Sequence, residues 1–171
     1  MNDAERLSDE AWLSRVFETH QRALMGYVSQ LMGSAERASD VVQDAFVRLC
    51  RQPREKVEDR VKPWLYAVCR NRAMDILKKE NRMRTMAEAG SEQIGRDSDP
   101  RFVIQERDTV QHANSLMQRL PARQQEVIRL KIESGLTYRE ISDLTGLSVS
   151  NVGYLLHTGL KAIRNRLATI E

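Results

Sequence analysis

Apolar residues recur every three or four positions along each long segment of the chain, which is the spacing of one face of a helix. The first such stripe contains Leu13, Phe17, Leu24, Val28 and Leu31. No stretch alternates apolar and polar residues between turn signals, as a half-buried strand would. The pattern therefore predicts an all-helical fold.

Capping and breaking residues mark the ends of the first two helices. Ser8 is the expected N-cap of the first helix, because its hydroxyl could accept a hydrogen bond from the first turn, and Gly33-Ser34 is the expected end. A second helix runs through Val42 to Leu49, and Pro53 stops it. The segment from Gln52 to Lys62 should then be a polar loop, since a proline marks each of its ends.

The third helix begins near Pro63, a residue that suits a first turn because no hydrogen bond is lost there. At about 100° per residue, Leu65 and Cys69 share one apolar face, whereas Trp64 falls on another. Trp64 and Tyr66 at the head of this helix are expected to be exposed aromatic residues. Trp64 has two open interpretations, a binding surface or simple packing against the preceding loop.

A stretch rich in Gly, Ser and acidic residues, placed at 86–104, is typical of a flexible linker. It divides the chain into expected helical domains of residues 1–85 and 105–171. A helix from about Phe102 to Leu120 should lead to Pro121, and two or three further helices should close the chain. The predicted architecture is two small helical domains on a tether.

Positive charge is concentrated in one segment of the chain. The net charge is only +3, yet residues 60–84 hold eight Lys or Arg and two Asp or Glu. Residues 1–59 have three more acidic than basic residues. A basic stripe on a mildly charged protein indicates a polyanion site.

Several classes of chemistry find no support in the sequence. Cys50 and Cys69 are the only cysteines and lack a CxxC or a nearby His, so we expect buried thiols and no metal. P-loop, HExxH and GxSxG motifs are absent, and His20 falls on an apolar stripe as a core residue would. No apolar run approaches the roughly 18 residues of a membrane span. We therefore expect a cytosolic protein without a cofactor, a membrane insertion or an enzymatic activity.

The C-terminal stretch LTYREISDLTGLSVSNVGYLLHTGLKAIRNRL has the punctuation of a helix-turn-helix. Thr137 and Glu140 form a capping box, Gly146 ends that helix, and Ser148 caps the next one. The expected inward residues of the last helix are Val149, Val152, Leu156, Ile163 and Leu167. The expected outward residues, which would enter a DNA major groove, are Ser150, Asn151, Tyr154, Thr158, Lys161 and Asn165. Helix-turn-helix geometry also occurs in pure packing roles, and that alternative stays open.

Four motifs in this order resemble the bacterial sigma-70 family, in particular its small extracytoplasmic-function (ECF) branch, which keeps only the second and fourth conserved regions. They are LSRVFETHQRALMGYVSQLMG, ASDVVQDAFVRLC, KPWLYAVCRNRAMDILKK and LPARQQEVIRLKIESGLTYREISDLTGLSVSNV. The resemblance covers nearly the whole chain. It implies a protein that binds core RNA polymerase, directs it to promoters and helps to open the DNA.

The resemblance implies that the second helix docks on the clamp helices of the largest polymerase subunit. The residues on its outward side are Asp40, Gln43, Asp44, Val47 and Arg51. A solvated helix face is the alternative reading of this set.

The resemblance also implies that the first domain holds the displaced strand of the minus-ten element. Such a strand needs cations along its phosphates and surfaces on which bases stack, each stack being worth roughly 1–3 kcal/mol. The loop from Arg51 to Lys62 would hold a flipped base. The minus-ten residues would be Lys62, Trp64, Arg70, Asn71, Arg72, Asp75, Lys78 and Lys79, with Arg82 as a further phosphate contact.

The second domain would read the minus-thirty-five element as duplex and touch the polymerase flap. The residues assigned to that element are Arg139, Ser148, Ser150, Asn151, Tyr154, Thr158 and Lys161. This chain departs from its relatives by carrying Gly153 and Gly159 in the recognition helix. Either these glycines permit a close backbone approach, to DNA or to a neighbouring helix, or this domain grips DNA weakly.

Members of this branch are commonly held inactive by an anti-sigma factor, which is a further expected partner. A competing hypothesis is a regulator that uses the helix-turn-helix without entering the polymerase. That hypothesis leaves the basic aromatic helix unexplained, and the sequence offers no segment for a dimer interface or a sensor.

Overall fold

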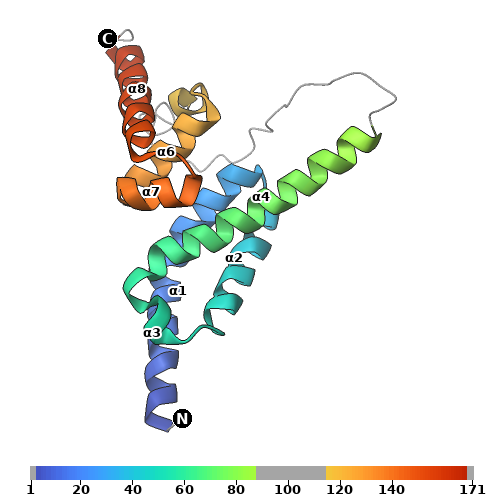
Figure 1. Cartoon of the computed structure of the whole chain (residues 1–171), viewed down its shortest axis with the longest axis vertical. Coiled ribbons are helices and arrows are strands. Elements are labelled where there is room, and N and C mark those ends of the chain that lie inside the picture. Colours follow the sequence, from blue (N-terminus) through green and yellow to red (C-terminus); the bar gives the residue numbers. More distant parts are fainter. Residues whose placement is uncertain (1–2, 88–114, 169–171) are drawn as a thin grey trace. The chain divides into compact units, whose positions relative to one another are not determined.

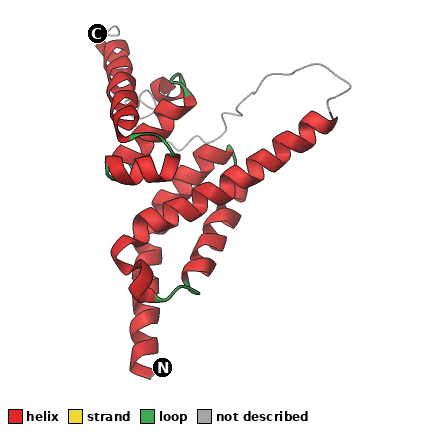
Figure 2. Cartoon of the chain, in the orientation of Figure 1, coloured by secondary structure: helices red, strands yellow, loops and turns green. Residues whose placement is uncertain are grey.

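The computed structural model describes residues 3–87 and 115–168 (Figure 1). These ranges contain helices, turns and loops but no strand, as Figure 2 shows. The chain divides into two compact units, Met1–Ser98 and Asp99–Glu171. The prediction of an all-helical protein is confirmed. The expected linker at 86–104 lies almost wholly outside the described residues.

Helix α1 spans Asp3–Met32 and begins before the expected cap. Ser8 therefore lies inside the helix, and its Oγ accepts a hydrogen bond of 3.2 Å from Nη1 of Arg54. The N-cap prediction for Ser8 is wrong, because the side chain is used by a distant loop instead of by the first turn. Gly33 ends the helix with a φ of 67°, a conformation that glycine adopts without strain.

Helix α2 spans Ala35–Leu49 and is capped by Ser34, whose Oγ accepts a hydrogen bond from the Arg37 backbone N–H at 3.4 Å. Its apolar face packs against α1 and α4. The edge of the Phe46 ring meets the Phe17 ring of α1, with 4.9 Å between the centroids. The buried residues of this helix are Ala38, Val41, Val42, Ala45, Phe46 and Leu49.

The segment after α2 is more structured than a polar loop. It contains α3, Arg54–Val57, and a 3₁₀ turn η1, Glu58–Arg60. Pro53 precedes α3 as its N-cap residue, and Val57 is buried in the unit. The sequence prediction missed these elements because one turn of helix leaves no periodic signal.

Helix α4 spans Val61–Ala87, and Pro63 falls in its first turn as expected. Leu65, Cys69 and Ala73 are fully buried, which confirms the expected apolar face. Tyr66 is only 1% exposed, with its ring centroid 5.3 Å from that of Tyr27 on α1. The expectation that Tyr66 is exposed is therefore wrong, since α1 covers the side of α4 on which it lies.

The described part of the second unit, residues 115–168, contains a helical turn at 115–118 and three helices, α6 Ala122–Ile132, α7 Tyr138–Thr145 and α8 Val149–Ala168. Helix α6 packs against α8, and α7 packs against both. The expected helix from Phe102 to Leu120 lies outside the described residues up to position 114. The buried apolar residues here are Leu116, Met117, Leu120, Val127, Ile128, Leu130, Leu136, Ile141, Val152 and Leu156.

The two glycines of α8 have different surroundings. A Cβ at Gly159 would lie 2.8 Å from Cδ1 of Ile128 on α6, closer than packed carbon atoms approach. A Cβ at Gly153 would lie 3.5 Å from the Tyr138 ring on α7, an ordinary contact. Of the alternatives raised by the sequence, Gly159 fits the close approach of a neighbouring helix.

Two residues of α8 depart from their expected burial. Val149 is 42% exposed and Leu167 is 43% exposed, although both belong to the expected inward stripe. Val149 is the first residue of the helix and Leu167 falls in its last turn, where α6 and α7 no longer cover the stripe. Val152 and Leu156, in between, are buried as expected.

Candidate nucleic-acid and polymerase interfaces

One exposed strip of α4 carries most of the expected minus-ten residues. At about 100° per residue, the six positions of this strip fall within about 120° of the helix circumference, outside the face that holds the buried residues. All six are exposed, and the C-terminal part of α4 extends beyond the other helices of its unit (Figure 1). We call this set the basic strip: Asn71, Arg72, Asp75, Lys78, Lys79 and Arg82.

The cations of the basic strip keep their positive charge available. No Asp or Glu of the described ranges lies within 4.0 Å of the charged nitrogens of Arg72, Lys78, Lys79 or Arg82. Arg37 of α2 forms an ion pair of 2.5 Å with Glu80 of α4. Glu80 is therefore already paired and does not neutralise the cations of the strip. An exposed line of unneutralised cations attracts phosphates.

The other three minus-ten candidates are half-buried. Trp64 falls on the same side of α4 as the basic strip, at the N-terminal end of the helix. Lys62 and Arg70 fall outside the strip. Lys62 lies near His20 of α1, where burial first and the Lys62 charge second lower the pKa of that imidazole.

His20 itself differs from the expected core histidine. Its side chain is half-buried instead of enclosed, and the lowered pKa favours the neutral ring.

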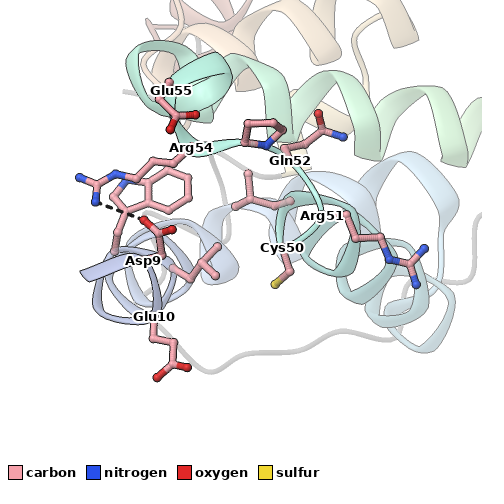
Figure 3. A pocket seen from close by; sticks show the side chains of 11 residues that line it. Asp9, Glu10, Cys50, Arg51, Gln52, Arg54 and Glu55 are labelled. Carbon is pink, nitrogen blue, oxygen red and sulfur yellow. Dashed lines mark ion pairs between the residues drawn. The ribbon is translucent and has the colours of Figure 1, made fainter. Parts of the chain in front are cut away.

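The loop expected to hold a flipped base borders a cavity of about 440 Å³ (Figure 3). The cavity is walled by the N-terminal part of α1, the end of α2 and the start of α3. Its lining residues are Asp9, Glu10, Trp12, Leu13, Leu49, Cys50, Arg51, Gln52, Pro53, Arg54 and Glu55.

The outward side of α2 carries four of the five expected polymerase contacts, and Arg51 lies in the turn after the helix ends at Leu49. Asp40, Gln43 and Arg51 are exposed, and Val47 is 50% exposed although it is apolar. Asp44 is half-buried, and its Oδ2 lies 3.0 Å from Nε of Arg48 in an i,i+4 ion pair. A mixed acidic and apolar surface of this kind fits a protein partner better than DNA.

The two cysteines lie in different environments. Cys69 is fully buried, and burial, with the Asp44 charge as the smaller cause, raises the pKa of its thiol to about 12. Cys50 follows the last buried residue of α2 and is exposed. The expectation of two buried thiols is therefore wrong for Cys50.

Replacement Cys69→Ala should change how stability depends on pH above pH 9. The folded thiol stays protonated to about pH 12, whereas the unfolded thiol ionises near its ordinary value of 9.0. The stabilisation is therefore complete below pH 9 and is lost as the pH rises toward 12. We expect the wild-type chain to lose about 1.4 kcal/mol more per pH unit than the variant across that window. Urea unfolding at several pH values measures the slope, which the cavity left by alanine does not alter. Parallel pH curves for the two proteins would contradict this assignment.

The helix-turn-helix forms as expected within the second unit. Thr137 Oγ1 accepts from the Glu140 N–H at 3.2 Å, and Glu140 Oε2 accepts from the Thr137 N–H at 2.7 Å, which completes the capping box. Gly146 adopts a φ of 74°, and Ser148 Oγ accepts from the Asn151 N–H at 3.2 Å. These local contacts hold α7 and α8 in a tight turn.

Most of the expected minus-thirty-five residues are accessible. The exposed ones are Arg139, Ser148, Ser150, Asn151, Tyr154 and Lys161, with Tyr154 at 66%. Thr158 is half-buried; its hydroxyl donates to the Tyr154 carbonyl at 2.8 Å and accepts from Gln124 Nε2 at 3.2 Å. Thr158 therefore faces α6 more than the other members of the set.

Two residues near this surface were missed by the sequence analysis. Tyr138 is 39% exposed at the start of α7, where Lys131 Nζ lies 5.5 Å from its ring centroid. Arg164 is exposed on α8. Tyr138 falls in the first turn after the capping box, and its aromatic character was the available signal.

Within residues 3–87 and 115–168, no helix combines the length and apolar character that crossing a bilayer requires. In the same ranges, no three His, Cys, Asp or Glu side chains gather closely enough to hold a metal ion.

A basic helix in one unit and a helix-turn-helix in the other are features of DNA-binding transcription proteins. The family model of Sigma-70 region 2 matches residues 16–83, and that of Sigma-70 region 4 matches residues 113–163. The two matches together cover more than half of the chain. The chain belongs to the sigma-70 family, within its ECF branch.

Curated relatives match nearly the whole of this chain. The ECF RNA polymerase sigma factor SigD of Mycobacterium tuberculosis is 27% identical over 168 residues, which cover 93% of this chain and 78% of the relative. SigL of the same species is 26% identical over 160 residues, covering 92% of this chain and 89% of the relative. A crystal structure of the sigma factor RpoE with the anti-sigma factor NepR from Bartonella quintana matches with a TM-score of 0.66 and 19% identity. That match covers 94% of this chain and 97% of the RpoE chain, and it supports the fold.

Proposed function

We propose that this chain binds core RNA polymerase, directs it to a set of promoters and helps to melt them. The observation that carries the proposal is the basic strip of α4, whose cations have no acidic partner among the described residues. An exposed surface whose positive charges have no acidic partner favours the binding of a polyanion. The helix-turn-helix in the same chain supplies a second DNA contact.

The basic strip suits a displaced single strand. Arg72, Lys78, Lys79 and Arg82 would track the phosphates, while Asn71 and Asp75 would reach base edges. Trp64, at the head of the same side of the helix, would offer a surface for an unstacked base. The loop from Arg51 to Lys62 would hold a flipped base. Flipping costs a few kcal/mol and costs least for an easily unstacked base, so the identity of that base contributes to promoter recognition.

The outward side of α2 is the proposed contact with the clamp helices of the largest polymerase subunit. Its members are Asp40, Gln43, Asp44 and Val47, with Arg51 in the turn that follows the helix. Exposed apolar area at Val47 with acidic neighbours suits a basic helical partner. The second unit would touch the polymerase flap.

The second unit would read duplex DNA at the minus-thirty-five element. Asn151 lies in the first turn of α8, where a recognition helix contacts base edges, and an Asn side chain can bind adenine through two hydrogen bonds. Arg139 and Lys161 would contact phosphates.

The proposal also includes regulation by an anti-sigma factor and a cytoplasmic location. An anti-sigma factor would cover the surfaces that bind polymerase, as the RpoE relative is crystallised with NepR. The chain would act in the cytoplasm, and the chemistry of RNA synthesis would belong to the polymerase.

The proposal is tested by in vitro transcription of pooled genomic fragments by core polymerase, with and without this protein. Discrete new start sites are expected, with two shared sequence elements upstream of them. We expect Asn71→Ala to reduce promoter opening while leaving duplex binding intact. Asn151→Ala should weaken minus-thirty-five binding by about 1–3 kcal/mol.

Asn81→Ala is the matched control for Asn71→Ala, because Asn81 is exposed on α4 but falls outside the basic strip. If core polymerase gained no start sites while the protein alone shifted particular duplexes, the independent regulator would be the better hypothesis. The complete helix-turn-helix of the second unit is the observation that favours that alternative.

A further inference from the structure

Arg54 is unusual among the residues between α2 and α4. Every residue from 51 to 60 is exposed except Arg54, which is half-buried, and Val57, which is buried. The segment is therefore fastened to the body of the unit at two side chains. One is apolar and one is charged, and only the charged one can fix a direction through hydrogen bonds.

The Arg54 guanidinium uses all of its nitrogens. Nε and Nη2 donate to the two carboxylate oxygens of Glu58, at 2.9 and 3.0 Å. Nη1 donates to Ser8 Oγ at 3.2 Å and lies 3.6 Å from Asp9 Oδ1, the ion pair dashed in Figure 3. The guanidinium carbon lies 5.4 Å from the centroid of the Trp12 ring. One side chain thus joins α3 and η1 to two turns of α1, across 46 residues of sequence in the case of Ser8.

This arrangement requires arginine. A planar guanidinium can bind a carboxylate with two nitrogens, present a third to another helix and lie over an aromatic ring at the same time. A lysine ammonium keeps the charge, but its single nitrogen cannot satisfy Glu58, Ser8 and Asp9 in this geometry. The lowered pKa of Glu58, caused first by the hydrogen bond from Arg54, is consistent with a formed pair.

We propose that Arg54 is a positioning residue, which orients the α2–α4 loop against α1 so that the loop discriminates the flipped base of the minus-ten element. The Arg54 guanidinium is held by Glu58, Ser8 and Asp9, so it acts through the exposed side chains of the loop that it orients. The inference rests on the proposed function. A base pocket must be held within a fraction of an ångström to discriminate, and a shift of about 1 Å can cost a hundredfold.

Cys50 gives a reporter of loop geometry that does not depend on transcription. It is exposed beside Arg51–Arg54 at the rim of the cavity in Figure 3, whereas Cys69 is buried and serves as the internal control. If Arg54 holds the loop in place, loosening it should change the rate at which an uncharged maleimide modifies Cys50. Cys69 should stay protected in the folded protein.

The test compares Arg54→Lys with the wild-type full chain, alone and bound to core polymerase. We expect the modification rate of Cys50 to change at least about threefold and the preference for the favoured minus-ten base to fall about tenfold. Affinity for core polymerase and for a minus-thirty-five duplex should stay the same. Arg22→Lys is the matched control, because Arg22 is an exposed arginine of α1 and belongs to none of the proposed interfaces.

Asp9→Asn keeps the shape of the side chain and leaves the Glu58 fork intact, so it should shift both readouts in the same direction by a smaller amount. Circular dichroism checks that each variant is folded. Unchanged Cys50 reactivity with lowered base preference would overturn the positioning role and indicate direct DNA contact by Arg54. Changed reactivity with unchanged base preference would overturn the link to discrimination. A wild-type protein that gives no polymerase-dependent starts would instead remove the proposed function, while the Cys50 rates would still report on the loop.

Discussion

Replacing Arg72, Lys78, Lys79 and Arg82 together by Gln is expected to lower the affinity of the holoenzyme for a single-stranded minus-ten oligonucleotide roughly hundred- to thousandfold at 0.1 M salt. Each neutralised phosphate contributes about 0.7 to the slope of log affinity against log salt for a single strand. Loss of four contacts should therefore reduce the slope by about 3. Fluorescence anisotropy of a labelled oligonucleotide across a salt series measures both quantities.

A matched pair of double variants separates the basic strip from general charge. Lys78→Gln with Lys79→Gln removes two charges from the strip, and Arg15→Gln with Arg22→Gln removes two exposed charges from α1. The first pair should lower the salt slope by about 1.4 and the second should leave it nearly unchanged. Equal slopes for the two folded variants would show that the strip is not the phosphate-binding surface.

The two glycines of α8 should respond in opposite directions to alanine. Gly159→Ala places a Cβ 2.8 Å from Cδ1 of buried Ile128, so the Ile128 side chain or the two helices must shift. We expect a loss of about 1–3 kcal/mol in the stability of the second unit. Gly153→Ala meets only the Tyr138 ring at 3.5 Å and should gain up to about 1 kcal/mol, because alanine favours a helix over glycine.

Chemical denaturation of the two glycine variants, followed by two spectroscopic probes, tests this prediction. Both tryptophans, Trp12 and Trp64, belong to the first unit, so tryptophan fluorescence reports that unit and should not change. Far-UV circular dichroism reports both units, and its transition should move down for Gly159→Ala and up for Gly153→Ala. If Gly159→Ala left the stability of the second unit unchanged or raised it, the Ile128 side chain would have moved aside without loss of stability, and the predicted clash would be wrong.

Much of the candidate site was predictable from the sequence because its determinants are local. Helical spacing placed the basic strip on a different face of α4 from Leu65 and Cys69, and a helix allows no other arrangement of those positions. The polymerase and minus-thirty-five sets also lie on mainly exposed faces, as expected. Which of these residues touch DNA or polymerase remains a prediction.

The failures share one physical cause, which is contact with a distant segment. Tyr66 is buried because α1 covers it, and the Ser8 side chain accepts a hydrogen bond from Arg54 of α3 instead of capping α1. Thr158 is occupied by Gln124, from α6. None of these partners is a sequence neighbour, so periodicity and capping rules carry no information about them.

The sequence by itself determined the long helices, the capping box at Thr137, the turn at Gly146 and the angular position of each side chain around α4. These features depend on hydrogen bonds and rotations within a few residues, which the local sequence fixes. Only the tertiary structure decided that Gly159 lies against Ile128 of α6 and that Arg54 joins a loop to α1. Both depend on how closely separate helices approach, and that distance is set by the packing of the whole unit.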